Sequence, residues 1–340
     1  MLRPVQATVI FLVVFLGAVA VGLAIALPLT MRRIHAACPP GTAADAACPS
    51  GTAADAACPS GTAADAIRVS GTMTFVDNVP TVVTAYYDIP SKRPKSEYMR
   101  RIDTFFRRHP CNLVVFTSPD LVSTFKKMRG AYAEKTRIVS LPFEQLTSTQ
   151  DMAFWARQKD HDTTMPVLPE LYAIWAEKVY FLERALAMDP FKSSAFIWLD
   201  AGIMWESMVS ELCLSFPSAK RLGTLNASMV HLLEVVPFLQ EDRINPYNGA
   251  YPRLGGGCIL VHRDNVVKCR KLYELTRANL LSCGRSCALE EYVLNLMHLQ
   301  RPDFVALVHR TPWQGCSWTF MLFFLSDTFR VVEGATPQEA

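Results

Sequence analysis

The sequence predicts an α/β fold with one main folded domain. Short apolar runs alternate with amphipathic helical patterns from about residue 80 onward, which is typical of this class. The chain has 340 residues, of which 50% are hydrophobic, so it can bury a sizeable core. A net charge of +3 and the lack of a basic stripe interleaved with aromatic residues give no indication of nucleic-acid binding, and we expect no such partner.

The first half of this domain is expected to contain three strands and two helices. The strands are short runs rich in β-branched and aromatic residues, predicted at 81–86, 112–117 and 136–141. A helix is predicted at about 94–108, with apolar residues at helical spacing and a basic, solvated opposite face. A short helix is predicted after Pro119.

The second half is expected to continue the alternation. A long helix at 170–188 opens with Pro169 and ends before Asp189 and Pro190. Further segments are predicted as a strand at 194–200, a glycine-rich turn entering a strand at 255–262, a helix capped by Asp264 and running to about Leu281, a helix at 287–299, and a strand at 303–309.

The amino-terminal region has a different composition. From Val9 to Leu27 it has no charge and is long enough to cross a hydrocarbon core of roughly 30 Å. We therefore expect a transmembrane signal anchor at 9–30, behind a short tail at 1–8. A secretory signal peptide is the alternative, because small residues follow at 35–38.

A low-complexity stalk is predicted at 31–70, between this span and the folded domain at 71–330. Residues 37–66 are three near-exact copies of a ten-residue unit that has no large apolar residue, so this segment is expected to be disordered. Ten cysteines and the acceptor sequence at Asn226 favour a secretory lumen, whereas Arg32 and Arg33 mildly favour a cytoplasmic carboxyl side. Residues 331–340 are expected to be a carboxyl-terminal tail.

Asp200 is the first candidate for a site residue, because it ends the bulky apolar run of residues 196–199. Ligands in open α/β sheets bind beyond the carboxyl ends of the strands, although a cap or turn explains such an Asp equally simply. Asp200 is the first Asp of an Asp-x-Asp metal motif whose second Asp is missing. With His309 as a second ligand, Asp200 could hold Mn²⁺ or Mg²⁺; a merely hydrogen-bonded His309 is the alternative.

Three further features fit a ligand site. Gly256 and Gly257 permit close approach of backbone, as does a plain tight turn. Glu290 and Glu291 open a helix, where they could orient an acceptor hydroxyl or meet the helix dipole. Lys178 could bind a phosphate as a point charge, or be an exposed helical lysine.

The segments "TVVTAYYDIP", "YMRRIDTFF", "LVVFTSPDL" and "GGGCILVH", and above all the block at 169–203, resemble the HtrL/YibB-like protein family. That family is similar to nucleotide-diphospho-sugar transferases with a Rossmann-like A-type glycosyltransferase fold. The resemblance implies that Asp200 contacts the nucleotide sugar or its metal and that Lys178 is a basic helix position. It implies further nucleotide-binding positions at Thr84, Tyr86, Tyr87 and Gly202.

A span, a stalk and a transferase-like domain resemble the layout of single-pass Golgi glycosyltransferases. We therefore expect a type II membrane protein that moves a hexose from a nucleotide sugar to a glycan or glycoconjugate acceptor in the lumen. Two alternatives stay open: a non-catalytic glycan-binding protein that keeps the fold, and a cytoplasm-facing enzyme of polysaccharide assembly.

Overall fold

The computed structural model describes residues 75, 80–162, 167–204, 213–248, 252–309 and 317–327. The expected tail at 1–8, span at 9–30, stalk at 31–70 and tail at 331–340 lie outside these residues. Within the described part, none of the helices combines the length and the apolar composition needed to cross a membrane.

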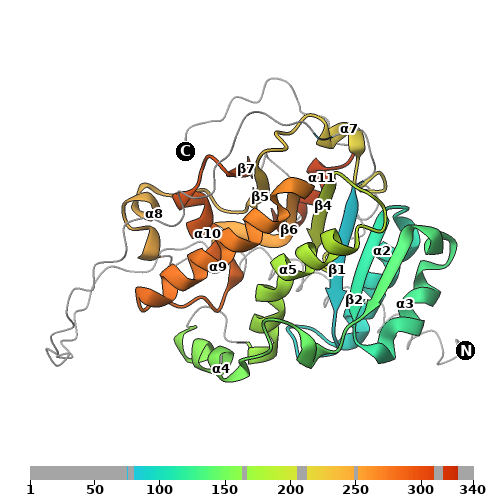
Figure 1. Ribbon diagram of the computed structural model, residues 1–340, viewed down its shortest axis with the longest axis horizontal. Helices are drawn as coiled ribbons and strands as arrows, with labels where there is room; N and C mark the ends of the chain where they lie inside the picture. Colours follow the sequence, from blue (N-terminus) through green and yellow to red (C-terminus); the bar gives the residue numbers. More distant parts are fainter. Residues whose placement is uncertain are drawn as a thin grey trace, which may run out of the picture. The chain divides into compact units, whose positions relative to one another are not determined.

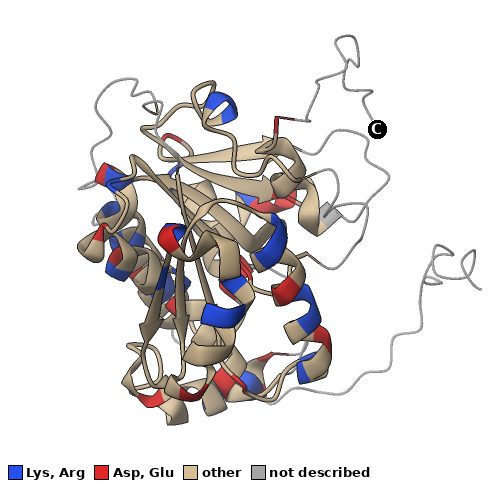
Figure 2. Ribbon diagram, turned by 90° about the vertical axis from the view of Figure 1, so that its right-hand side faces the viewer, with Lys and Arg blue, Asp and Glu red and all other residues tan. Residues whose placement is uncertain are grey.

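A seven-stranded mixed sheet forms the centre of the domain, in the order β3-β2-β1-β4-β6-β5-β7. The strands are β1 (Thr81–Tyr86), β2 (Asn112–Thr117), β3 (Thr136–Ser140), β4 (Ala195–Leu199), β5 (Val230–Glu234), β6 (Leu254–His262) and β7 (Val305–His309). β6 pairs antiparallel with both of its neighbours, whereas the other pairs are parallel. β2, β1, β4 and β6 contain no Lys, Arg, Asp or Glu, and Figure 2 shows the charged residues mainly on helices and loops.

Helices cover both faces of the sheet (Figure 1). One face packs against α4 (Met152–His161), α5 (Pro169–Met188), α9 (Val266–Ser282) and α10 (Glu290–Gln300). The other face packs against α2 (Lys95–Arg108), α3 (Val122–Arg129), α7 (Ala219–Leu222) and α11 (Phe320–Phe324). The remaining described helical segments are η2 (Pro119–Leu121), η3 (Gly130–Lys135), η4 (Phe143–Gln145), α8 (Gln240–Ile244), η5 (Pro246–Asn248), η6 (Arg263–Asn265) and η7 (Ser317–Thr319).

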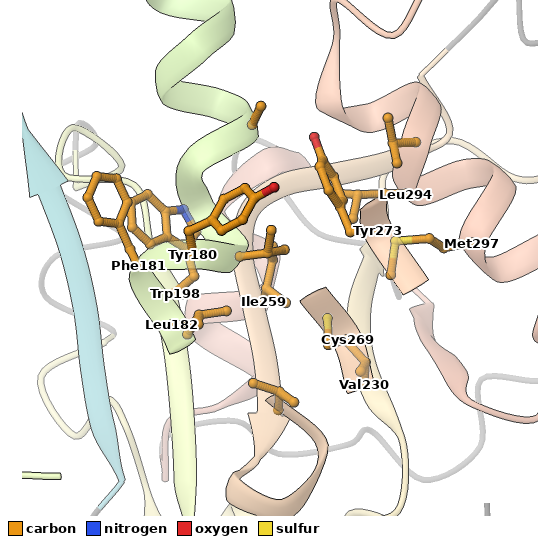
Figure 3. Packing of buried hydrophobic residues seen from close by; sticks show 14 of the residues in the cluster. Tyr180, Phe181, Leu182, Trp198, Val230, Ile259, Cys269, Tyr273, Leu294 and Met297 are labelled. Atoms are coloured by element: carbon orange, nitrogen blue, oxygen red, sulfur yellow. The ribbon is translucent and has the colours of Figure 1, made fainter. Parts of the chain in front are cut away.

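Helix α5 is the central helix of its layer and is buried along most of its length. Pro169 occupies the first turn, where its fixed φ suits a helix start, and Asp189 ends the helix in the left-handed conformation at φ 36°. Phe181 stacks on Trp198 of β4 with ring centroids 5.6 Å apart and planes 7° apart (Figure 3). This packing fixes α5 against the middle of the sheet.

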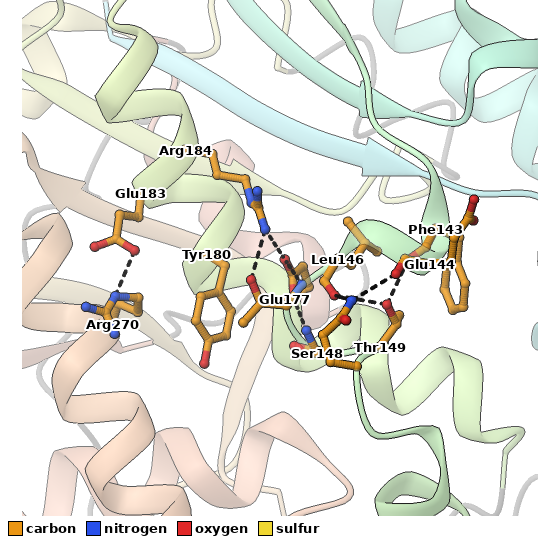
Figure 4. A network of polar contacts seen from close by, with 12 residues as sticks. Phe143, Glu144, Leu146, Ser148, Thr149, Glu177, Tyr180, Glu183, Arg184 and Arg270 are labelled. Atoms are coloured by element: carbon orange, nitrogen blue, oxygen red, sulfur yellow. Dashed lines mark hydrogen bonds and ion pairs between the residues drawn. The ribbon is translucent and has the colours of Figure 1, made fainter.

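Polar side chains of α5 connect this helix to two neighbouring segments of the same layer. The buried carboxylate of Glu177 accepts hydrogen bonds from the backbone N–H groups of Thr147 and Ser148, at 3.1 and 2.7 Å (Figure 4). Glu183 pairs with Arg270 of α9 at 2.8 Å in the same view. These contacts fix α5 to the loop before α4 and to α9.

The strand order places a topological switch point between β1 and β4. The chain moves from β1 to β2 and β3 on one side and then returns to place β4 on the other side of β1. In open α/β sheets a crevice forms at such a point, beyond the carboxyl ends of the two strands. Asp200 follows β4 directly, so it lies at this crevice.

The structure corrects several expectations about the second half of the chain. Residues 255–257 form part of β6, not a turn before it, and they adopt no positive φ. Asp264 lies in η6, and Asn265 precedes α9 without a side-chain cap. Strand β5 and helix α4 were not predicted, because the pattern between Asp200 and β6 is irregular and α4 has only a weak apolar face.

The Phe181 contact can be tested by truncation. Phe181→Ala should lower the free energy of unfolding by about 3–5 kcal/mol, because it removes a fully buried ring and leaves a cavity against Trp198. Leu281→Ala, at a 36% exposed position of α9, is the control and should change it by less than about 1 kcal/mol. Equal effects of the two variants in denaturant titrations would contradict this packing.

Candidate functional site

Two adjoining cavities open at the switch point. The first, here called the aromatic pocket, has a volume of about 110 Å³ and is lined by Ala85, Tyr86, Tyr87, Ile89, Ser91, Tyr98, Leu171, Ile174, Trp175, Lys178, Trp198, Asp200, Ala201 and Gly202. The second, here called the charged cleft, has a volume of about 450 Å³ and is lined by Lys92, Arg93, Tyr98, Arg101, Trp175, Asp200, Gly202, Ile203, Gly257, Glu290, Glu291 and Trp318. Tyr98, Trp175, Asp200 and Gly202 line both, so the two cavities adjoin each other.

Lys178 is the centre of the site. Its side chain is only 3% exposed, and its Nζ lies 3.1 Å from Asp200 Oδ1 and donates to Glu290 Oε1 and to the carbonyl of Gly256. A buried ammonium has three protons to place, and these three acceptors use all of them. One lysine therefore joins α5, the end of β4, β6 and the start of α10.

Asp200 is held on one edge and open on the other. Trp198 Nε1 donates to Oδ1 at 2.8 Å, the oxygen that also faces Lys178, and the backbone N–H of Asp200 donates to the carbonyl of Gly257 at 2.9 Å. The side chain is 39% exposed, in contrast to the 4% of Glu290. Asp200 Oδ2 is therefore the oxygen available to a ligand.

The charges of the cluster stabilise one another. Burial alone lowers the pKa of Lys178, but the carboxylates of Asp200, Glu290 and Glu291 outweigh this effect and raise that pKa. The lysine therefore stays charged throughout the neutral range. Its positive charge compensates the desolvation of the buried Glu290 carboxylate. Without this counter-ion, a buried carboxylate would strongly destabilise the fold.

Whereas the surroundings of Lys178 favour its charged form, those of Glu291 favour its neutral form. Burial and the neighbouring charge of Glu290 raise its pKa well above the ordinary carboxylate value, although Lys178 partly opposes the shift. Its Oε2 is buried without a hydrogen-bond partner among the described residues, as is Oε2 of Glu290. The site thus contains one carboxyl group with a raised pKa, Glu291, beside two acidic side chains that contact a lysine.

The glycines of the site allow close packing. A Cβ on Gly256 would lie 2.6 Å from Glu290 Oε1, and a Cβ on Gly202 would lie 2.7 Å from the ring of Tyr98. A Cβ on Gly257 would contact Asp200 Oδ2 at 3.5 Å. The structure therefore gives Gly256 a steric role in admitting Glu290 beside β6, and only Gly202 and Gly257 line a cavity.

The structure brings most of the predicted residues together. Tyr86 and Tyr87 line the aromatic pocket, and Glu290 and Glu291 line the charged cleft. Lys178 is buried, so the alternative of an exposed helical lysine is wrong. Thr84 does not line either cavity: it is fully buried within β1, on the face covered by α2 and α3.

His309 also lies away from the cluster. β6 and β5 separate β4 from β7, which amounts to about 14 Å across the sheet at a strand spacing of about 4.8 Å. The ring is 72% exposed, and its Nδ1 is 2.6 Å from Glu234 Oε2. The structure does not bring His309 and Asp200 together as ligands of one ion.

The described residues around Asp200 also do not suit a divalent cation. Asp200 Oδ1 already faces the ammonium of Lys178 and the indole N–H of Trp198. A metal ion at this carboxylate would lie close to a buried positive charge. Elsewhere in the described part of the chain, no three His, Cys, Asp or Glu side chains form a metal-binding group.

Three residues of the site were not predicted from the sequence. Arg101 was expected on the solvated face of α2, but it is 6% exposed and donates to the carbonyl of Gly202 at 3.1 Å. Trp175 was expected only as an apolar helix residue, yet it lines both cavities. Trp318 is 41% exposed and lines the charged cleft. Only the position of Arg101 one turn before the apolar Phe105 hinted at its burial.

The fold and the site define an α/β protein with two adjoining cavities at a topological switch point, lined by aromatic and ionic residues. The chain belongs to the family described as "Bacterial protein of unknown function (HtrL_YibB)", whose family model matches residues 78–313. The comparison with curated proteins found no match. Among solved structures, the apo crystal structure of mouse xyloside xylosyltransferase 1 is similar at 10% identity and a TM-score of 0.42, with 67% of this chain and 84% of that chain covered.

The ionic cluster predicts a large effect of removing its lysine. Lys178→Met should lower the free energy of unfolding by about 3–5 kcal/mol, because Glu290 is left buried without its counter-ion. The double variant Lys178→Met/Glu290→Gln should recover part of this loss. A single variant that costs less than about 1 kcal/mol in denaturant titrations would contradict the cluster.

The raised pKa of Glu291 predicts a pH dependence of stability. Native Glu291 keeps its proton above pH 4.5, near which an unfolded glutamate loses it, so this residue makes the free energy of unfolding fall as pH rises towards the raised pKa. Glu291→Gln removes this effect. The variant should match the wild type near pH 4 and become the more stable protein at neutral pH; a difference that does not change with pH would contradict the assignment.

Proposed function

We propose that this protein is a glycosyltransferase that moves a hexose from a nucleotide-diphosphate sugar to a glycan or glycoconjugate acceptor. The observation that carries the proposal is the carboxylate of Asp200, which pairs with Lys178 and lines two adjoining cavities at the switch point of the sheet. Open α/β sheets bind their ligands, nucleotides among them, at this position. The resemblance of the family to nucleotide-diphospho-sugar transferases supports the same reading.

The two cavities suit the parts of such a donor. The aromatic pocket presents Tyr86, Tyr87 and Trp175, whose ring faces suit a flat nucleobase. Asp200 Oδ2 can accept hydrogen bonds from sugar hydroxyl groups. The sugar then lies beside Glu290 and Glu291 in the charged cleft.

In the proposed reaction the acceptor oxygen forms a bond to the anomeric carbon, while the bond from that carbon to the diphosphate oxygen breaks. The bonding electrons leave with the nucleoside diphosphate, and the hydroxyl proton passes to a carboxylate. Glu291 suits this role, because a carboxylate with a raised pKa is a stronger base once it is ionised. Glu290 and Lys178 position Glu291 and Asp200.

Two parts of the proposal rest on the sequence alone. The signal anchor at 9–30 and a type II orientation with a lumenal domain stay predictions from the amino-terminal region. Mn²⁺ or Mg²⁺ at the donor site also stays a sequence-based prediction, which the donor set around Asp200 does not favour.

A second candidate is a glycan-binding protein that keeps the fold without turnover. It is favoured by one observation, that Lys178 engages both Asp200 and Glu290 and so gives these carboxylates a structural use. The partly exposed Trp318 beside the charged cleft offers a surface on which a sugar ring can stack.

Turnover tests the first candidate. With a panel of nucleotide sugars and glycan acceptors, Glu291→Gln should lower kcat by about 100-fold or more while the affinity for nucleoside diphosphates persists. In the wild type, kcat/KM should rise with pH above the ordinary carboxylate range, as Glu291 loses its proton. Glu183→Gln is the control, since Glu183 pairs with Arg270 and lines neither cavity.

Two outcomes would contradict the transferase. If no nucleoside diphosphate or nucleotide sugar binds at millimolar concentration, the first candidate fails. If glycans bind equally well to the wild type and to Asp200→Ala, while no donor is consumed, the glycan-binding candidate is the better account.

A further inference from the structure

We propose that basic side chains of the loop after β1, namely Lys92 and Arg93, hold the diphosphate of the donor in place of a divalent cation. This inference rests on the proposed function and specifies how its site neutralises the leaving group. It starts from the charge distribution within the charged cleft, where Lys92 and Arg93 line one part and Asp200, Glu290 and Glu291 line another.

Lys92 lies at the junction of the two cavities. Its Nζ is 4.5 Å from the ring centroid of Trp175, which lines both the aromatic pocket and the charged cleft. Among the described residues no carboxylate pairs with this ammonium, so the aromatic face is its main contact. A cation held over an indole ring stays positioned while its N–H groups remain available to an anion.

Arg93 adds a second cation beside Lys92. Its Nη1 lies 3.0 Å from Glu97 Oε1, and this carboxylate oxygen also pairs with Arg101. One carboxylate therefore serves two guanidinium groups. The Arg93 side chain is 48% exposed, so its remaining N–H donors can turn towards a phosphate, which a planar guanidinium binds in bidentate fashion.

The acidic part of the charged cleft is the reason to place the diphosphate beside the loop that carries Lys92 and Arg93. Asp200 and Glu290 would repel a phosphate, whereas sugar hydroxyl groups can donate to them. Lys178 is buried behind Asp200 and Glu290 and is already engaged by both. A donor with its sugar at Asp200 and its base in the aromatic pocket therefore places its diphosphate nearest to Lys92 and Arg93.

In this arrangement Lys92 and Arg93 take the role that a metal ion has in an Asp-x-Asp motif. Such a motif neutralises the diphosphate through a cation held by carboxylates, but the Asp200 carboxylate here is partly neutralised by Lys178. Two side-chain cations on a loop supply positive charge without metal ligands. Donor binding should then be independent of Mn²⁺ and Mg²⁺ and should weaken with rising salt.

The test is a binding titration of the full-length chain with UDP, GDP, CDP and ADP, each with EDTA and with Mn²⁺. At least one nucleotide should bind with equal affinity in both conditions. Lys92→Met/Arg93→Gln should weaken that binding by about tenfold or more, while the matching nucleoside binds unchanged. Lys92→Met keeps an aliphatic chain over Trp175, and Lys92→Arg should retain most of the affinity.

Lys95→Met is the matched control, because Lys95 follows this loop as the first residue of α2 but pairs with Asp88 and does not line the charged cleft. Binding that requires Mn²⁺, or that survives in Lys92→Met/Arg93→Gln, would overturn this inference and leave the transferase intact. Failure of every nucleotide to bind the wild type would overturn the proposed function, and this inference with it.

Discussion

The site depends on one buried ammonium. Lys178 of α5 binds Asp200 beyond β4, Glu290 at the start of α10 and the backbone of β6 at Gly256. A lysine can be buried here only because two carboxylates compensate its charge, and Glu290 can be buried only because of the lysine. Lys178 and Glu290 therefore require each other, and their contact joins the start of α10 to α5.

The strand order of the sheet determines where the crevice lies, and side chains from the helices and loops supply most of its aromatic and charged groups. The reversal of strand order beside β1 opens the crevice, and the uncharged central strands leave its floor apolar. Aromatic rings from β1, α2 and α5 line the aromatic pocket, whereas most of the charged groups of the site line the charged cleft. Such a division suits a ligand with a flat apolar end and a polar, anionic end, which is the chemistry of a nucleotide sugar.

Regular local patterns could be predicted from the sequence, and long-range partners could not. β1, β2, β3, α2, α5 and β4 lie close to their predicted bounds, because apolar period and flanking turn residues report local structure. Arg101 looked like a surface residue of a basic helix and is buried, because the carbonyl of Gly202 and the carboxylate of Glu97 accept its hydrogen bonds. His309 looked like a metal ligand at a strand end, but the strand order places it near Glu234 instead.

The sequence by itself determined the α/β class, most strands and helices, and the position of Asp200 at the end of a buried strand. These properties depend on residues close together in the chain, whose period and order can be read directly. Only the tertiary structure decided that Lys178, Asp200 and Glu290 form one cluster, since residues 178 and 290 are brought together by the packing of α5 against β1 and β4 and of α10 against β6 and α5. Strand order and helix packing depend on the whole core, and no local pattern contains that information.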